Sequence, residues 1–244
     1  MQKSSILSIL LVLTLANAVS AAPVGYISPR KSRISVSATL IALTKRQTEH
    51  LGNTTMKVDG QYDALLGRVS YGISDQIEVY GQIGMADAGL HQVQGTRQFE
   101  RINNSGLETA WGAGVQAIVF ENPKIDWNIG IDLQYLETNN HSGVAANGTT
   151  AGSRWEFDVI EWHVAAQIQK SFRVLDSWIG IKYSKAKFEN LIIAGVPQIG
   201  SLASEDPLGF YTGINMPLSE NWSMYAEARI IDETALSGGA RYDF

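Results

Sequence analysis

The sequence contains no cysteine. It therefore cannot form a disulfide, a thiolate metal site or the acylated cysteine that anchors a lipoprotein. Beyond its first residues it also has no run of about 18 consecutive apolar residues, so we expect no membrane-spanning helix. Acidic residues slightly outnumber basic ones, 24 against 19. This mild negative charge argues against nucleic acid as a partner.

The first residues have the pattern of an export signal. Lys3 supplies the positive start, residues 6–15 form an apolar stretch too short to span a bilayer comfortably, and small residues follow it. We expect cleavage after Ala21, which makes residues 1–21 a signal peptide and residues 22–244 a single domain. An uncleaved membrane anchor is the alternative, and the short apolar stretch argues against it.

The rest of the sequence alternates apolar and polar residues with a period of two, which is typical of strands. Ser74-Asp75 makes a tight turn between the two clearest strands. Turn-forming segments divide the chain into ten predicted strands with boundaries uncertain by about three residues. These strands are 33–46, 56–72, 76–86, 107–120, 125–137, 154–170, 177–188, 208–217, 222–232 and 235–244.

The connections between these strands differ in length at the two ends. Most of those at one end are short, whereas 87–106, 138–153 and 189–207 at the other end are long and mostly polar. This asymmetry is typical of outer-membrane barrels, whose long loops face outward. We therefore expect an all-β fold, a closed antiparallel transmembrane β-barrel of ten strands, with eight and twelve as the alternatives. An even strand number places both termini on the periplasmic side.

One face of the predicted strands is almost free of charge. In a soluble sandwich this face would be the core, and in a membrane barrel it faces lipid, so alternation alone does not distinguish the two. The signal peptide, the loop asymmetry and the terminal Phe244 together favour the barrel. Aromatic residues near the strand ends are predicted to lie at the membrane interface. They are Trp111, Trp127, Trp162, Trp222, Tyr242 and Phe244.

The opposite face carries polar residues of both signs, and we expect it to line a narrow lumen. An unpaired buried charge is costly, so mixed charges favour a lumen filled by ion pairs over a selectivity lining of one sign. In the first strand, Arg33 and Lys45 share the parity of the polar face, so they would add two cations to the lumen. The predicted lumen network consists of Arg68, Glu78, Asp126, Asp132, Glu161, His163, Lys182, Glu227, Arg229 and Arg241.

Three local patterns could carry chemistry, and each has a simpler interpretation. Residues 112–117 match a relaxed dinucleotide fingerprint but lie inside a predicted strand with no helix after them. His163 beside Glu161 could be a general base, yet no serine is placed with it as a nucleophile. His141 lies in a predicted solvated loop. We therefore expect no catalytic, cofactor or metal site.

The chain resembles small bacterial outer-membrane β-barrel proteins of the opacity-like and porin-like kind. The resemblance is carried by Tyr71-Gly-Ile-Ser-Asp with Ile77-Glu-Val-Tyr-Gly, by Trp111-Gly-Ala-Gly, and by the closing Gly238-Gly-Ala-Arg-Tyr-Asp-Phe. It implies insertion into outer-membrane lipid by the barrel assembly machinery, which would read the C-terminal strand. The omptin-type proteases are similar in strand number, but their paired-Asp and His-Asp sites have no match here.

The leading hypothesis is a non-enzymatic, Gram-negative outer-membrane barrel, either structural or a small passive pore with a largely salt-bridged lumen. The second hypothesis is an adhesion or ligand-binding protein that acts through its outer loops on an extracellular ligand. A barrel hydrolase is the third.

Overall fold

The computed structural model describes residues 23–50, 57–94, 101–104, 107–146, 154–193, 200–204 and 206–244. The predicted signal peptide, residues 1–21, lies outside these ranges. Within them the secondary structure is entirely strand and turn. No helix of this part of the chain is long and apolar enough to cross a membrane.

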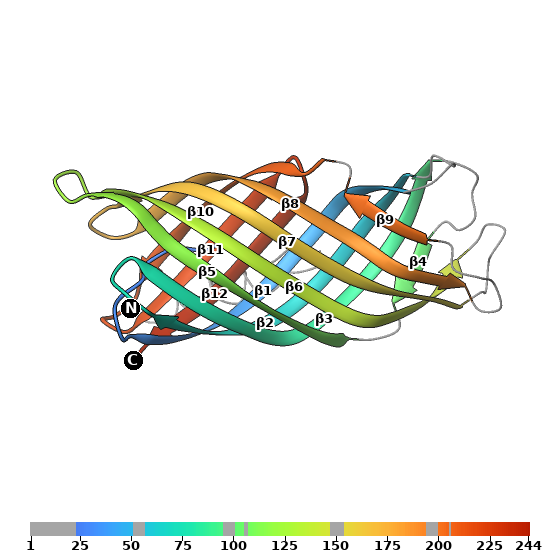
Figure 1. The fold of residues 1–244 in the computed structure, drawn as a ribbon, viewed down its shortest axis with the longest axis horizontal. Helices are drawn as coiled ribbons and strands as arrows, with labels where there is room; N and C mark the ends of the chain where they lie inside the picture. The colour runs from blue at the N-terminus through green and yellow to red at the C-terminus, as the bar shows by residue number, and fades with distance from the viewer. Residues whose placement is uncertain are drawn as a thin grey trace, which may run out of the picture.

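Ten long strands pair side by side in antiparallel fashion, and the last returns to pair with the first. The result is the closed ten-strand barrel that the sequence predicts (Figure 1). Its strands are β1 (Ile34–His50), β2 (Lys57–Gly72), β3 (Ile77–Gln94), β5 (Glu108–Asn122), β6 (Trp127–Ala146), β7 (Arg154–Ser171), β8 (Asp176–Ile193), β10 (Leu208–Pro217), β11 (Trp222–Ile230) and β12 (Thr234–Asp243).

The barrel wall has two heights. Strands β1, β2, β3, β6, β7 and β8 have 16 to 20 residues, whereas β10, β11 and β12 have only 9 or 10. A tilted strand needs about 9–11 residues to cross a bilayer, so the short strands have the length of one crossing and the long strands project beyond it. Strand β1 begins and the chain ends, at Phe244, opposite the projecting strands (Figure 1).

Two short strands, which the sequence analysis assigned to loops, extend the sheet at the tall end. Strand β4 (Arg101–Asn104) pairs with β3 and β6 above the end of β5. Strand β9 (Gly200–Ser204) pairs with β8 and β1 above the three short strands. Eight strands therefore close a second ring, which we call the collar, in the order β1, β2, β3, β4, β6, β7, β8 and β9.

The outward face below the collar is a belt of exposed apolar side chains. Along β7 the outward residues Trp162, Val164 and Ile168 are exposed, and the inward residues between them are buried. The belt ends where outward charge begins, as at Lys185 and Lys187 on β8. The apolar-out arrangement required of a membrane barrel is therefore present in the wall itself.

Candidate functional site

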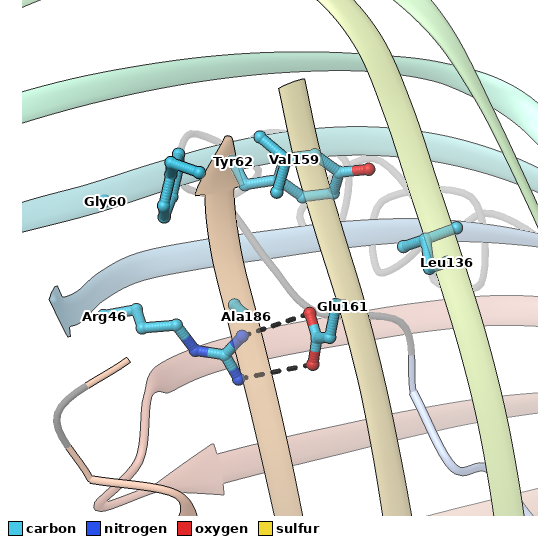
Figure 2. A pocket seen from close by; sticks show the side chains of 8 residues that line it. Arg46, Gly60, Tyr62, Leu136, Val159, Glu161 and Ala186 are labelled. Carbon is cyan, nitrogen blue, oxygen red and sulfur yellow. Dashed lines mark hydrogen bonds and ion pairs between the residues drawn. The ribbon is translucent and has the colours of Figure 1, made fainter. Parts of the chain in front are cut away.

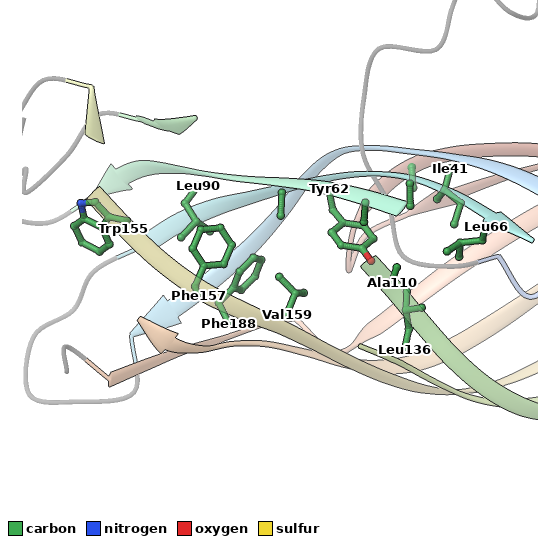
Figure 3. Close-up of a cluster of buried hydrophobic side chains, with 14 residues drawn as sticks. Ile41, Tyr62, Leu66, Leu90, Ala110, Leu136, Trp155, Phe157, Val159 and Phe188 are labelled. Atoms are coloured by element: carbon green, nitrogen blue, oxygen red, sulfur yellow. The ribbon is translucent and has the colours of Figure 1, made fainter. Parts of the chain in front are cut away.

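Among the described residues, the buried polar and charged side chains cluster in the lumen of the barrel. The side chains inside the lumen form layers along its length. The layer nearest the tall end is apolar, which the sequence analysis did not predict for an inward face. Figure 3 shows Trp155 outermost, with Phe157 and Phe188 beside each other and Tyr62 deeper in the barrel. The rings of Phe157 and Phe188 have centroids 5.9 Å apart. This aromatic layer occupies the interior of the collar.

His141 belongs to the aromatic layer, above the apolar belt. Its side chain is fully buried, its ring stacks on Phe157 at 5.5 Å, and its Nε2 lies 2.8 Å from Thr138 Oγ1. Burial lowers the pKa of His141 to about 4, against a smaller opposing effect of Asp158. The prediction that His141 lies in a solvated loop is wrong, because β6 continues past it and a register shift at 138–141 turns it inward.

Beneath the aromatic layer lies a compact ion cluster. Its six core members are the cations Arg46, Lys182 and Arg229 and the anions Glu161, Asp232 and Glu233. A fourth buried carboxylate, Glu227, lies 3.6 Å from Arg229 and adds one more negative charge. Arg46 contacts Glu161 at 3.1 Å and Glu233 at 3.0 Å, and the first of these contacts is drawn in Figure 2. All six side chains are at least nine-tenths buried.

The turn between β11 and β12 supplies two of these carboxylates. Ile231 has a φ of 87°, a left-handed backbone that a β-branched residue rarely adopts, and its own side chain is exposed. The next two residues, Asp232 and Glu233, are both buried inside the barrel. The short strands thus end in a turn that folds into the lumen under β9. A cavity of about 20 Å³, room for about one water molecule, is lined by Arg46 and Glu161 of the cluster and by Tyr62 and Phe188 of the aromatic layer.

A third layer of polar side chains occupies the middle of the barrel. His163 Nε2 lies 2.6 Å from Asp132 Oδ2, and the Tyr80 hydroxyl donates to Asp132 at 3.0 Å and to Gln134 at 2.8 Å. The guanidinium of Arg68 lies 3.9 Å from the centre of the Tyr80 ring. His163 therefore pairs with Asp132 on the neighbouring strand. The neighbour suggested by sequence, Glu161, belongs to the ion cluster.

The end of the barrel opposite the collar has a smaller ion network and an internal segment. Arg241 bridges Glu78 at 3.0 Å and Asp243 at 2.9 Å. Residues 23–29, which we call the strap, run from inside the barrel to its rim ahead of β1, with Val24 and Ile27 fully buried. The strap borders a cavity of about 330 Å³ that also reaches Arg241 and Asp243. Sequence analysis gave the strap no role.

Most of the predicted lumen residues do lie inside the barrel. Seven of the ten are buried, and Arg68 and Arg241 are half-buried and contact the inward residues Gln134 and Glu78. The prediction for Asp126 is wrong, because Asp126 is exposed in the turn between β5 and β6 with a φ of 52°. The sequence analysis also missed Arg46. A bulge after Leu43 shifts the register of β1, so that Arg46 faces the lumen.

The predicted interface aromatics lie on the outer surface in two groups. Trp222, Tyr242 and Phe244 stack in sequence near the short turns, with centroids 5.0 and 4.7 Å apart, and Trp127 packs on Phe120 at 5.1 Å. Towards the collar, Trp111 packs on Tyr135 and Trp162 on Tyr183, each at 5.7 Å. Two groups at opposite edges of the apolar belt form the arrangement expected of interfacial girdles.

The ion cluster, the Asp132–His163 pair and the Arg241–Glu78 pair hold most of the buried charged side chains of the lumen. Within the described ranges, no group of three or more His, Asp or Glu side chains has an arrangement that could hold a metal ion. The glycines at 112 and 114 lie in β5 against Gln82 and Tyr80, where they make room for those side chains. The arrangement can therefore hold a lumen closed.

No known family model matches the sequence, and a search of curated proteins finds no relative. Several solved structures have a similar overall fold. An outer membrane channel from Pseudomonas putida F1 is 10% identical with a TM-score of 0.45, covering 92% of this chain and 100% of that one. The outer membrane protease OmpT from Escherichia coli is 9% identical with a TM-score of 0.47, covering 91% and 99%.

A third similar structure is the translocator domain of the autotransporter NalP from Neisseria meningitidis. It is 12% identical with a TM-score of 0.44, covering 91% of this chain and 90% of that one. A channel, a protease and a translocator differ in activity, and the identities are low. The fold assignment therefore rests on the strand pairing of this chain, and its function has to be argued from the lumen.

Proposed function

We propose that this chain is a non-enzymatic, integral β-barrel of the bacterial outer membrane whose lumen is closed to solutes at rest. The observation that carries the proposal is the ion cluster. Each of its three cations is paired with buried carboxylates, and its members are buried across the lumen beneath an aromatic layer. An open passage needs hydrated or one-sign walls, whereas a paired and water-poor cluster supports a structural role.

The outer-membrane location is supported by the wall. The exposed apolar belt, the two aromatic groups at its edges and short strands with the length of one bilayer crossing are what a membrane barrel requires. A soluble barrel would not expose a continuous belt of apolar and aromatic side chains to water.

Planar-bilayer recording of the purified protein tests the closed lumen. We expect no stable conductance steps above those of the empty bilayer at neutral pH. Substituting Arg46 and Glu161 together by alanine removes one cation and one anion, so the net charge of the cluster is unchanged while its packing is lost. This variant is expected to show measurable steps. Large, stable steps from the unaltered protein would overturn the proposal.

A second candidate function, surface binding, is favoured by the height of the wall. Strands β6, β7 and β8 rise above the belt, and this rising part exposes charged residues such as Arg154, Glu156 and Lys187. Binding to whole cells or extracellular polymers, compared between the protein and a variant shortened in 147–153, tests this function. Unchanged lipid and peptide substrates after incubation would dispose of the hydrolase hypothesis.

A further inference from the structure

The strap is held inside the barrel through its main chain. Glu227 accepts hydrogen bonds from the N–H groups of Val24 at 3.2 Å and Gly25 at 3.0 Å through its two oxygens. Gln169 accepts from the N–H of Ile27 at 2.7 Å and donates to the Ile27 carbonyl at 2.9 Å. Both main-chain polar groups of Ile27 are thus bonded to one barrel side chain.

Three more barrel side chains bind the strap carbonyls. Gln116 donates to Val24 O at 2.6 Å, Gln167 donates to Gly25 O at 3.1 Å, and Arg68 donates to Pro23 O at 3.2 Å. Seven main-chain groups of residues 23–27 are therefore satisfied by five side chains from β2, β5, β7 and β11. Recognition of this kind gives affinity without requiring particular side chains on the bound segment.

Side-chain pockets add specificity to this recognition. Val24 and Ile27 are fully buried and pack with Ala165, Trp178 and Tyr211. Gly130 lies opposite Ile27, and a Cβ built on Gly130 would meet the Ile27 side chain at 2.8 Å, with all three of its nearest neighbours in Ile27. Gly130 thus leaves room for Ile27.

The backbone of the strap also requires one special residue. Gly25 has a φ of 76°, in the left-handed region that favours glycine. It lies between the two buried apolar residues, so the bend at Gly25 sets how they enter their pockets. The order of residue types over 24–27, apolar, glycine, aromatic and apolar, thus fits the side-chain pockets of the barrel interior.

The strap is joined to the wall by an exposed turn. Arg30 and Lys31 are exposed, and the turn is fixed by the Ser32 N–H donating to Gly72 O at 2.8 Å and the Lys31 N–H donating to Asp75 at 3.1 Å. The cavity of about 330 Å³ lies beside the strap. The strap is therefore covalently linked to the barrel at one exposed place and has free space next to it.

We propose that the periplasmic half of the lumen is a binding site for a peptide main chain bent at a glycine, and that the strap, residues 23–29, is its resident ligand. The barrel side chains bind the strap non-covalently, as they would bind a separate peptide. The strap therefore stays bound when its covalent link to β1 is cut, and it exchanges with an added peptide of the same sequence. This goes beyond the closed-lumen proposal and does not depend on it, because the ion cluster and the aromatic layer close the barrel above the strap.

Cleavage after folding tests the proposal without requiring the barrel to fold alone. A protease recognition sequence inserted between Arg30 and Lys31 is cut in the folded, detergent-solubilised protein. Mass spectrometry after gel filtration then measures the retained strap fragment. We expect most of the fragment to co-elute with the barrel, and an excess of labelled synthetic peptide 23–30 to replace it.

Two matched changes separate recognition from simple packing. A peptide N-methylated at Gly25 and Ile27 loses two N–H donors and should bind at least about tenfold more weakly. Gly130→Val fills the Ile27 pocket and should weaken the native peptide by a similar factor. The same variant should recover binding to a peptide carrying Ile27→Ala, because the smaller side chain restores the space.

Several results would overturn the inference. They are loss of the cut fragment during gel filtration, equal binding of the N-methylated peptide, and no recovery by the paired Gly130 and Ile27 changes. None of these results would alter the conductance expected from the intact protein. A conducting intact barrel that still retained its cut strap would contradict the closed lumen alone.

Discussion

Lys182 and Lys187 form a matched pair for testing the ion cluster, because they lie on the same strand and differ in their surroundings. Lys182 is fully buried and contacts Asp232 at 3.1 Å and, more closely, Glu233. Lys187 is half-exposed and lies 3.5 Å from Glu189 on the outer surface. Replacement of each lysine by glutamine removes one positive charge and keeps the side chain polar.

The two substitutions should differ greatly in cost. Loss of Lys182 takes one cation away from its buried partners Asp232 and Glu233, and breaking a buried pair on one side costs about 3–5 kcal/mol. Loss of Lys187 breaks an exposed pair that contributes at most about 1 kcal/mol. Removing the partner as well, in Lys182→Gln with Glu233→Gln, restores the net charge of the cluster and should recover a large part of the loss.

Urea unfolding in detergent or lipid vesicles measures these differences, with folded barrel identified by its faster migration on an unheated denaturing gel. We expect the midpoint of Lys182→Gln to fall well below that of Lys187→Gln. The double variant should lie between Lys182→Gln and the unaltered protein. Equal midpoints for the two single variants would refute the argument, since they would show that the cluster is hydrated.

Three further predictions concern separate parts of the barrel. His141 binds protons more weakly when folded, with a pKa of about 4 against 6.5, so stability should be full above pH 6.5 and fall by roughly 3 kcal/mol as the pH drops to 4. His141→Gln should remove most of this slope, and an unchanged slope would contradict the assignment. Gly114→Val should destabilise the barrel by about 1–3 kcal/mol or more, because a Cβ there would lie 2.3 Å from the Tyr80 ring. Gly81→Val, whose Cβ meets nothing within 4 Å, should be nearly neutral by the same urea assay, and equal losses would refute the packing argument. Deletion of Phe244, whose exposed ring packs on the preceding aromatic, should reduce the fraction of exported chain that becomes heat-modifiable barrel, and an unchanged fraction would remove its assembly role.

The wall of the barrel could be predicted from sequence because one rule governs all of it. Every strand below the collar alternates between lipid-facing and inward side chains, so the parity of a few residues such as Val164 and Asp132 fixes the rest. The short turns could also be predicted from the sequence. Ser74 caps its own turn by accepting from the N–H groups of residues 76 and 77.

The contents of the lumen were harder to predict because they depend on departures from that rule. The bulge in β1 changes which residue faces inward, and the adjacent Lys45 and Arg46 give a cation at either parity, so the sequence does not reveal the shift. Asp232 and Glu233 enter the lumen only because Ile231 adopts a left-handed backbone. Neither feature has a signal in the alternation pattern.

The strap and the collar were missed for a different reason, since both depend on contacts between distant residues. Val24 and Gly25 meet Glu227 more than 200 residues away, and nothing in residues 23–28 alone specifies that partner. The pairing of β9 with β1 joins residues 202–204 to 48–50. Local alternation predicts that a segment is extended, and it does not predict which edge the segment joins.

The pairing of β1 constrains the order in which the chain can be completed. One edge of β1 pairs with β12 along residues 35–45 and with β9 along residues 48–50. That edge has no partner from the preceding chain, and its unsatisfied main-chain groups invite pairing with other proteins. This edge of the first strand can be completed only after residues 200–243 have been delivered, because β9 and β12 each pair with a different part of it.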